Sequence, residues 1–261
     1  MTGKIIAERT GPVASLVFDN PERRNAVSLD MWRTVEQVLA EFAADAEIRV
    51  MLVAGAGDKA FVSGADISRF ESERAGRAAV AEYNASAERA YAALYSFPRP
   101  TIATIRGACI GGGVNLAVCC DLRLCGEGSR FAVPAAKLGL GYGLHPIQRL
   151  ASVIGTSRAM EMLYTAHTFT AQEAAQFGLV HRAVPEHQLE GTVDEYAAMI
   201  AANAPLTIAA AKAVVGELRK EPAARDQGKL QRIVDACFES QDYIEGRRAF
   251  MEKRKPRFTG A

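Results

Sequence analysis

Short apolar segments alternate with longer amphipathic segments along the first two thirds of the chain. Five short segments, rich in β-branched and aliphatic residues, predict strands at residues 13–19, 49–54, 101–106, 121–125 and 130–133. Three others predict helices: one capped by Ser28 with apolar positions three or four apart, a second at residues 75–97, and a third at 114–120. Because strands alternate with helices, the pattern predicts an α/β architecture with crossover connections.

From about Gly155 onward only helical patterns remain, at residues 157–165, 170–177, 188–203, 206–219, 224–240 and 242–254. No Gly/Ser-rich linker precedes this helical region. We therefore expect an α/β core at residues 1–195 and a helical region at 196–261 that docks on its own core or on a neighbour. An oligomer is the expected consequence.

Composition and charge narrow the class of protein. The 261 residues include 31 Lys or Arg and 30 Asp or Glu, a net charge of +1, which argues against a nucleic-acid binder with a basic surface. The N-terminus lacks a signal-peptide pattern, and no apolar stretch reaches 18 residues, so no membrane partner is expected. The five cysteines show no CxxC pair and no zinc-type spacing with histidine. Buried reduced thiols in a cytoplasmic protein, with no metal, are the expectation.

Two glycine-containing turns are the strongest candidates for chemistry. Residues 55–60 imitate a dinucleotide fingerprint, but Phe61-Val62-Ser63 does not open a helix, so a plain loop is expected there. By contrast, residues 60–67 and 107–116 each place small residues at a turn, where backbone approaches a ligand closely. The second segment also opens a helix, whose free N–H groups attract negative charge. Two backbone amides from separate turns are what an oxyanion hole requires, although a glycine run at a helix start is also a common packing device.

These segments resemble the crotonase, or enoyl-CoA hydratase/isomerase, superfamily. The resemblance rests on FVSGADI followed by GACIGGGVNLAVCCDLRL, and extends to DNPERRNAVSLDM, LGLGYGLHPIQRLASVIG, TAQEAAQFGLVHRAVP and AFMEKRKPRFTG. It implies a spiral core of repeated ββα units, a C-terminal helical trimerisation region, and homotrimers or dimers of trimers. It also implies an acyl-CoA substrate, with coenzyme A as part of the substrate and no permanently bound cofactor.

Site residues follow from the resemblance, motif by motif. Ala65 and Gly112 are expected to hold the thioester oxygen through their backbone amides and so stabilise an enolate. The remaining residues are expected to contact CoA: Arg24, Ala26, Gly64, Asp66, Ile67, Gly111, Phe250 and Lys253. Phe250 and Lys253 match positions that often reach CoA from a neighbouring subunit. A lysine in a KRK run is also typical of an exposed, solvated charge, and a phenylalanine is also typical of a core contact.

The chain departs from the hydratase pattern at both acid positions. Where hydratases of this family carry two glutamates, this sequence has Asn115 and Ala135, and neither takes up a proton at neutral pH. We therefore expect a cavity without an acidic side chain. Tyr142 and His145 are the replacement candidates, and LGLGYGL is similar to the corresponding stretch of methylmalonyl-CoA decarboxylases.

A lyase of decarboxylase type is the first expectation, with Tyr142 orienting the substrate. The departing CO2 leaves its bonding electrons on the α-carbon, so no base is needed to remove an α-proton. The alternatives are a hydratase or isomerase with displaced acid/base groups, an acyl-CoA hydrolase that uses His145, and a catalytically silent acyl-CoA binder.

Overall fold

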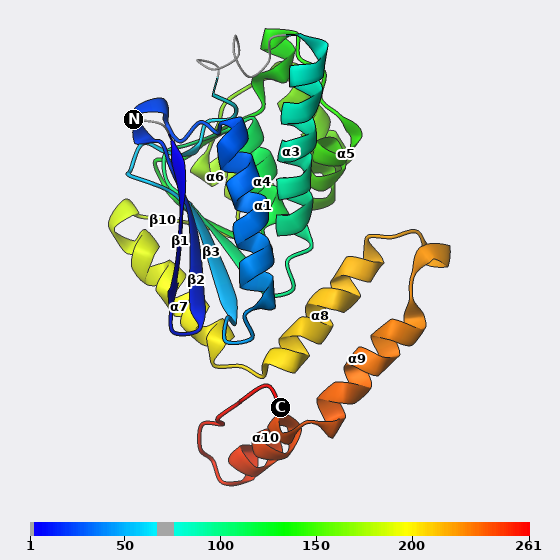
Figure 1. Cartoon of the computed structure of the whole chain (residues 1–261). Helices are drawn as coiled ribbons and strands as arrows, with labels where there is room; N and C mark the ends of the chain where they lie inside the picture. Colours follow the sequence, from blue (N-terminus) through cyan, green and yellow to red (C-terminus); the bar gives the residue numbers. More distant parts are fainter. Residues whose placement is uncertain (1–2, 67–75) are drawn as a thin grey trace.

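A computed structural model describes residues 3–66 and 76–261, whose strands form two sheets (Figure 1). The larger sheet has the order β1 (Lys4–Thr10), β2 (Val13–Asp19), β3 (Val50–Gly55), β5 (Thr101–Ile105), β7 (Leu122–Gly126) and β10 (Arg182–Val184). The smaller sheet has the order β4 (Ala60–Val62), β6 (Ala108–Ile110), β8 (Arg130–Ala132) and β9 (Phe169–Thr170). The pairs β1–β2 and β8–β9 are antiparallel, and the other neighbours are parallel.

One plan repeats three times along the chain: a strand in the larger sheet, a strand in the smaller sheet and, further along, a helix. The three units are β3–β4 with α3 (Arg77–Tyr95), β5–β6 with α4 (Gly112–Cys119), and β7–β8 with α5 (Leu144–Thr165). Each unit carries the chain from one sheet to the other and back. The expected α/β spiral core of ββα units is therefore confirmed, and the turns between its sheets lie close together in space.

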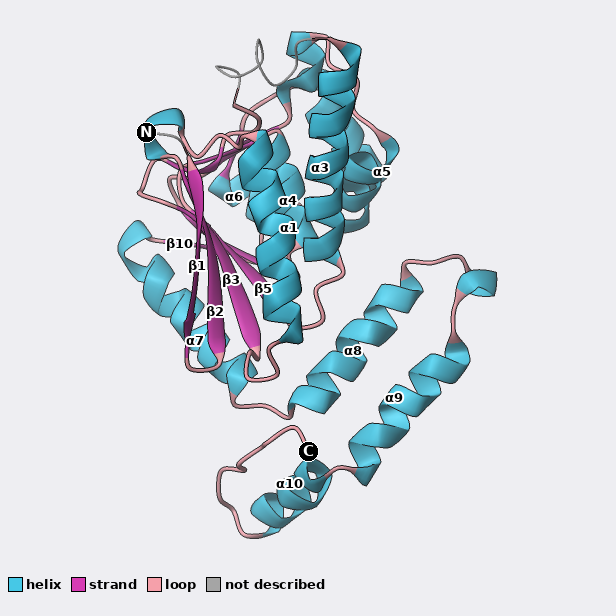
Figure 2. Ribbon diagram, in the orientation of Figure 1, coloured by secondary structure: helices cyan, strands magenta, loops and turns pink. Residues whose placement is uncertain are grey.

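Helices α1 (Leu29–Ala44) and α3 pack side by side over one face of the larger sheet (Figures 1 and 2). The Ser28 hydroxyl caps α1 as expected, accepting a hydrogen bond from the Met31 amide at 3.3 Å. The buried face of α1 consists of Met31, Trp32, Val35, Val38 and Leu39. These residues follow the spacing of three or four positions from which the helix was predicted. This face joins the main core, which also encloses α4.

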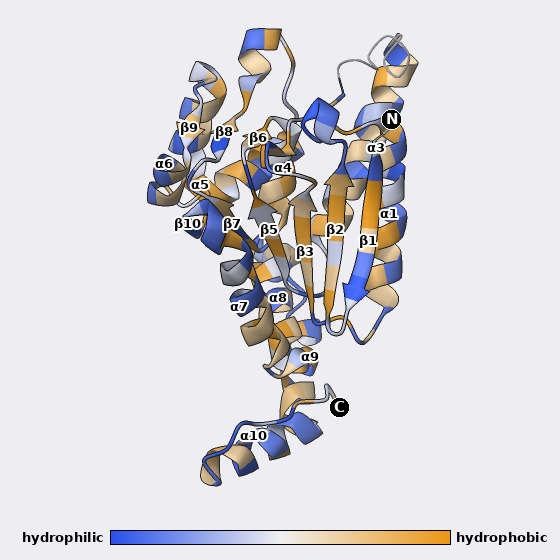
Figure 3. Cartoon of the chain, turned by 90° about the vertical axis from the view of Figure 1, so that its left-hand side faces the viewer, coloured by the Kyte–Doolittle hydropathy of each residue, from blue (hydrophilic) through white to orange (hydrophobic). Residues whose placement is uncertain are grey.

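Helix α7 (Leu189–Ala201) covers the opposite face of the larger sheet (Figure 3). Its Leu189, Val193 and Ala197 pack on Val50, Ile102 and Leu124 in a second apolar cluster. Burial on both faces explains why β3 and β5 read as nearly continuous apolar runs rather than alternating ones.

Three C-terminal helices extend away from the sheets: α8 (Pro205–Leu218), α9 (Gln227–Glu239) and α10 (Gln241–Met251) (Figure 1). Lys212 ties α8 to the core, donating to the Arg99 carbonyl at 2.7 Å and to the Asp121 carboxylate at 2.6 Å. Several large apolar side chains of the extension are exposed: Val215, Leu218, Phe238, Tyr243, Ile244, Phe250 and Met251. The division at residue 195 stays a prediction, and that residue lies inside α7.

The expectation of helices alone after Gly155 is wrong. Strands β9 and β10 follow it, and the short helix α6 (Ala171–Gln176) lies between them. These strands contain two and three residues, too few to show an alternating pattern. They form because their backbone groups complete the exposed edges of β8 and β7. The sequence pattern likewise named no strand at β1, β4 or β6.

Among the described residues, no single helix has the length and apolarity to cross a membrane. One pair of helices, Glu186–Ala201 with Pro205–Leu218, passes by length and composition but is bent by 103° at its break.

Candidate active site

A cavity of about 610 Å³ lies between the turn after β4, the start of α4, one side of α3 and the loop before α5. We call it the α3–α4 cavity. The four residues expected to be catalytic line it together with both positions that lack the hydratase acids. Its lining includes Gly64, Ala65, Glu88, Tyr91, Gly111, Gly112, Asn115, Ala135, Tyr142 and His145.

The first glycine turn is held by the segment that precedes α1. The Val27 amide donates to the Gly64 carbonyl at 2.9 Å, and the Asp66 amide donates to the Val27 carbonyl at 3.1 Å. These two bonds form a parallel bridge on either side of Ala65, so the Ala65 amide faces away from Val27. Gly64 has φ +102°, a conformation that a side chain would strain.

The second turn lies directly against the first. A Cβ placed on Gly112 would lie 3.5 Å from the Gly64 Cα and 2.8 Å from the Tyr91 hydroxyl. Gly112 is the first residue of α4, where an amide has no partner within the helix. Among the described residues, neither the Ala65 amide nor the Gly112 amide donates a hydrogen bond. The structure thus brings two free backbone donors from separate turns to one wall of the cavity.

Asn115 and Ala135 lie on the wall of the same cavity, so the two missing acids belong to its lining. Asn115 is only 5% exposed, and its Oδ1 is the one fully buried side-chain oxygen or nitrogen in the described part of the chain that lacks a hydrogen-bond partner. A buried carbonyl oxygen without a hydrogen-bond partner lowers the stability of the fold.

The expectation of a cavity without an acidic side chain is wrong, because Glu88 of α3 lines it. The Glu88 carboxylate accepts two hydrogen bonds from Arg149 of α5, with Nη1 to Oε2 at 3.1 Å and Nη2 to Oε1 as the second pair. The Arg149 side chain is buried, and its guanidinium lies 5.9 Å from the centre of the Tyr91 ring. Nothing in the α3 sequence distinguishes Glu88 from Glu82, the other acidic residue of this helix.

Tyr142 and His145 occupy different environments. The Tyr142 hydroxyl donates to the Gly111 carbonyl at 3.3 Å, and burial raises the pKa of this phenol well above its ordinary value. The phenol therefore stays protonated at neutral pH and serves as a donor rather than a base. His145 lines the cavity from an exposed position at the start of α5.

The expected CoA contacts near the N-terminus share one tight turn. Arg24 has a positive φ of 52°, and the neighbouring Asn25 has 56°. Asn25 is fully buried and holds the turn with three hydrogen bonds: from the Asn20 amide at 3.0 Å, and to the Ala56 and Ala60 carbonyls at 2.9 and 2.7 Å. Sequence reasoning missed Asn25, although an asparagine in a turn segment is the signal for such a role.

The other expected CoA residues are dispersed. Ala26 and Asp66 are buried beside the first turn, and Ile67 lies outside the described residues. Phe250 is 83% exposed, and Lys253 follows α10 in the C-terminal extension, which lies apart from the helices around the cavity (Figure 1). Within one chain, these two residues are not brought to the α3–α4 cavity.

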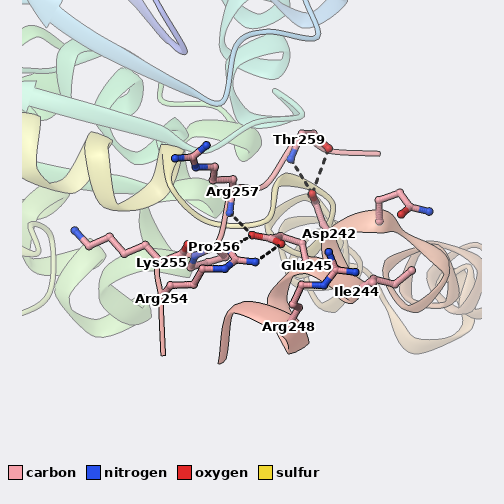
Figure 4. Close-up of a pocket in the computed structure, with 10 residues that line it drawn as sticks. Asp242, Ile244, Glu245, Arg248, Arg254, Lys255, Pro256, Arg257 and Thr259 are labelled. Atoms are coloured by element: carbon pink, nitrogen blue, oxygen red, sulfur yellow. Dashed lines mark hydrogen bonds and ion pairs between the residues drawn. The ribbon is translucent and has the colours of Figure 1, made fainter. Parts of the chain in front are cut away.

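A second hollow of about 950 Å³, the C-terminal pocket, lies between α10 and the residues that follow it (Figure 4). Most of its charged side chains form ion pairs or hydrogen bonds within the pocket. Arg254 pairs with Glu245 at 2.6 Å, and the Thr259 amide donates to Asp242 at 2.7 Å. Hydrogen bonds from Arg254 lower the pKa of Glu245 to about 2. The pocket contains none of the residues expected to perform chemistry.

The cysteine side chains lie mostly in the interior of the protein. The five cysteines are unpaired and four are buried, and burial raises the pKa of the Cys119 thiol to about 12. In residues 3–66 and 76–261 no group of three His, Cys, Asp or Glu side chains is placed to hold a metal ion.

The two sheets and the repeated strand–strand–helix units define a fold of the crotonase type, and comparison with known proteins agrees. The model of the enoyl-CoA hydratase/isomerase family matches residues 8–261, and the chain belongs to that family. It is 32% identical over 254 residues to the crotonyl-CoA hydratase of Syntrophomonas wolfei, covering 97% of both chains. It is 29% identical to the carnitinyl-CoA dehydratase of Salmonella arizonae over the full length of both.

Solved structures give the same assignment. The chain superposes with a TM-score of 0.93 on a structure described as an enoyl-CoA hydratase/carnithine racemase from Magnetospirillum magneticum, with 34% identity, covering 100% of this chain and 97% of the other. These relatives give no support to the expected likeness to methylmalonyl-CoA decarboxylases. They favour the alternative of a hydratase or isomerase.

Proposed function

We propose that the protein adds water to, or removes it from, an acyl-CoA thioester bound in the α3–α4 cavity. The observation that carries this proposal is the pair of unpartnered amides at Ala65 and Gly112, which lie together on the cavity wall. They would hold the thioester oxygen and stabilise the negative charge that builds on it. The hydratase and dehydratase among the relatives support this direction of chemistry.

Glu88 is the proposed acid/base group, displaced from the two positions that hydratases use. Water addition forms a C–O bond at the β-carbon and a C–H bond at the α-carbon, and the double-bond electrons pass through the enolate. The reaction thus requires a group that takes a proton from water and returns one to carbon. Arg149 occupies one site on each Glu88 oxygen, and each oxygen keeps a second lone pair for water or substrate.

The proposed CoA site combines residues from two copies of the chain. The turn at Arg24 and Ala26, with Asp66 and the glycines at 64 and 111, would receive CoA on the side of the first turn. Phe250 and Lys253 would arrive from a neighbour in a homotrimer or dimer of trimers. The exposed apolar residues of α8–α10 support such an assembly, because large apolar patches are usually covered in the functional state. Lys253→Glu should weaken CoA binding without changing the oligomer measured by light scattering, and unaltered binding would remove Lys253 from the site.

Decarboxylation is the second candidate, and one observation favours it. Glu88 is engaged by Arg149 in two bonds, while the wall formed by Asn115 and Ala135 is uncharged. In this reaction the bond to the carboxylate breaks, its electron pair enters the thioester enolate, CO2 leaves, and the α-carbon then takes a proton from solvent. The protonated Tyr142 hydroxyl would orient the departing carboxylate by turning its one hydrogen from the Gly111 carbonyl to the substrate.

Product analysis with a panel of thioesters tests both candidates. Crotonyl-CoA, 3-hydroxybutyryl-CoA and methylmalonyl-CoA are incubated with the wild type and with Glu88→Gln, which keeps the shape of the side chain. Glu82→Gln is the matched control, since Glu82 lies on the same helix and is exposed. Hydration should fall by at least about 100-fold in Glu88→Gln and stay within about twofold in the control. Melting curves establish that both variants are folded.

The other outcomes select the remaining functions. Release of CO2 from methylmalonyl-CoA that survives Glu88→Gln and is lost in Tyr142→Phe would replace hydration by decarboxylation. Release of free CoA that is lost in His145→Ala would indicate hydrolysis. Tight binding of the thioesters with no turnover would indicate a silent acyl-CoA binder.

A further inference from the structure

The peptide unit between Gly111 and Gly112 carries one of the two amides of the candidate oxyanion hole. Its nitrogen belongs to Gly112 and its carbonyl to Gly111, and we call it the 111–112 peptide. Glycine lies on both sides of it, so the two backbone bonds about which it rotates meet the least steric resistance. Gly111 has φ 56° and ψ −111°, outside the regions that other residues favour. Sterics alone therefore do not fix the direction of the Gly112 amide.

The peptides before and after this unit are each held by a hydrogen bond. The Gly111 amide, which belongs to the preceding peptide, donates to the Ala132 carbonyl of β8 at 2.8 Å. The Gly112 carbonyl, which belongs to the following peptide, accepts from the Tyr91 hydroxyl at 3.1 Å. The freedom that remains is a rotation of the 111–112 peptide between two fixed neighbours.

Tyr142 meets the carbonyl end of the 111–112 peptide. Its hydroxyl donates to the Gly111 carbonyl at 3.3 Å, and the Asn115 amide donates to the same oxygen at 3.2 Å in the first turn of α4. The oxygen and the hydrogen of a trans peptide point in opposite directions. Two donors that hold the oxygen along α4 therefore keep the Gly112 N–H directed out of the start of the helix.

A hydrogen bond at the carbonyl also strengthens the amide of the same peptide. Hydrogen bonds in a chain polarise one another by about 10–30% per bond. The effect grows as negative charge builds on a bound thioester oxygen, because an amide that donates more strongly makes its own carbonyl a better acceptor. A bond that strengthens in the transition state raises kcat rather than the affinity for substrate.

We infer that Tyr142 is a positioning residue of the oxyanion hole: its hydroxyl holds and polarises the 111–112 peptide, and so acts on the thioester oxygen through the Gly112 amide. This inference rests on the proposed function, since it assumes that the thioester oxygen binds at Ala65 and Gly112. The raised pKa of Tyr142 keeps the hydroxyl hydrogen in place at neutral pH. In this role the hydroxyl touches the peptide and not the substrate.

Infrared difference spectroscopy measures the polarisation of a bound thioester without turnover. Butyryl-CoA with an isotopic label at its thioester carbonyl is the probe, because it has no double bond, hydroxyl or free carboxylate to react. Binding to the wild type should shift the carbonyl band to lower frequency. Tyr142→Phe removes only the hydroxyl and should reduce that shift by about a tenth to a third. Tyr164→Phe is the matched control, since Tyr164 lies on α5 with 74% exposure, and it should leave the band unchanged.

Steady-state kinetics on the thioester that the panel identifies give the second measurement. An amide donor worth about 100- to 1000-fold in kcat, strengthened by 10–30%, owes about 2- to 8-fold to that strengthening. The kcat of Tyr142→Phe should fall by this factor, while KM and the affinity for free CoA stay within about twofold. A purely structural loss would lower the melting temperature and weaken CoA binding without this separation of kcat from KM.

The outcomes separate this inference from the proposed function. An unchanged band and an unchanged kcat in Tyr142→Phe would overturn the inference even if the wild type hydrates crotonyl-CoA. A raised KM for methylmalonyl-CoA with an unchanged band would place the hydroxyl on the substrate and also overturn it. A band shift that depends on Tyr142 in a protein with no turnover would support the inference and contradict the proposed function.

Discussion

The Gly112 amide can be removed selectively because proline has no N–H and is well tolerated at the first position of a helix. Gly112 is that position in α4. A Cβ there would lie 2.8 Å from the Tyr91 hydroxyl, so the substitution needs a background in which that oxygen is absent. The Tyr91→Phe variant, which lacks the hydroxyl, provides that background. Gly112→Ala in the same background is the matched control, because it adds the Cβ and keeps the amide.

The expected magnitude follows from the number of donors. The structure offers two free amides for one thioester oxygen, and the loss of one donor of this kind lowers kcat by about 100- to 1000-fold, about 3–4 kcal/mol. Tyr91→Phe/Gly112→Pro should show this loss relative to Tyr91→Phe. Tyr91→Phe/Gly112→Ala should stay within about tenfold, since the remaining contact to Gly64 at 3.5 Å is an ordinary one.

The assay is single-turnover kinetics on whichever thioester the panel identifies, together with calorimetric binding of free CoA. Free CoA has no acyl oxygen, so its affinity should change little in either double variant. If the proline variant turns over as fast as the alanine variant, the Gly112 amide does not stabilise the reacting oxygen, and the central argument about this site fails.

The remaining predictions concern stability. Asn25→Ala removes the three hydrogen bonds that hold the Arg24 turn and should lower the free energy of unfolding by about 3 kcal/mol in urea titrations, whereas a loss below about 1 kcal/mol would contradict the account of that turn. Lys212→Met should cost about 2 kcal/mol, because it leaves the Asp121 carboxylate without its cation, and unchanged urea stability would show that this tie is not needed. The pKa of Glu245 is lowered to about 2 in the folded chain, so its contribution is fully present above its unfolded pKa near 4.5 and disappears as the pH falls toward 2. Glu245→Gln should therefore lose less stability than the wild type between pH 4.5 and 2, and parallel acid titrations by circular dichroism would contradict this.

Much of the spiral core was predictable because long elements carry a periodic pattern. The Ser28 cap and the spacing of Met31 and Val35 specify α1, and the glycine turns at residues 64 and 111–113 mark both sides of the candidate oxyanion hole. The short strands β9 and β10 carry no such pattern. Their partners are strands distant in sequence, so the pairing energy that forms them is a property of the assembled sheets.

The sequence alone therefore predicted the features that lie within single motifs: the two small-residue turns and the uncharged pair at Asn115 and Ala135. It also predicted the family, which the comparisons support. The carboxylate at Glu88 was decided only by tertiary structure. It reaches the cavity because α3 packs beside the start of α4 and because Arg149, 61 residues further on, holds it there. The partnerless oxygen of Asn115 has the same origin, since a hydrogen bond is missing only relative to the neighbours that folding assembles around it.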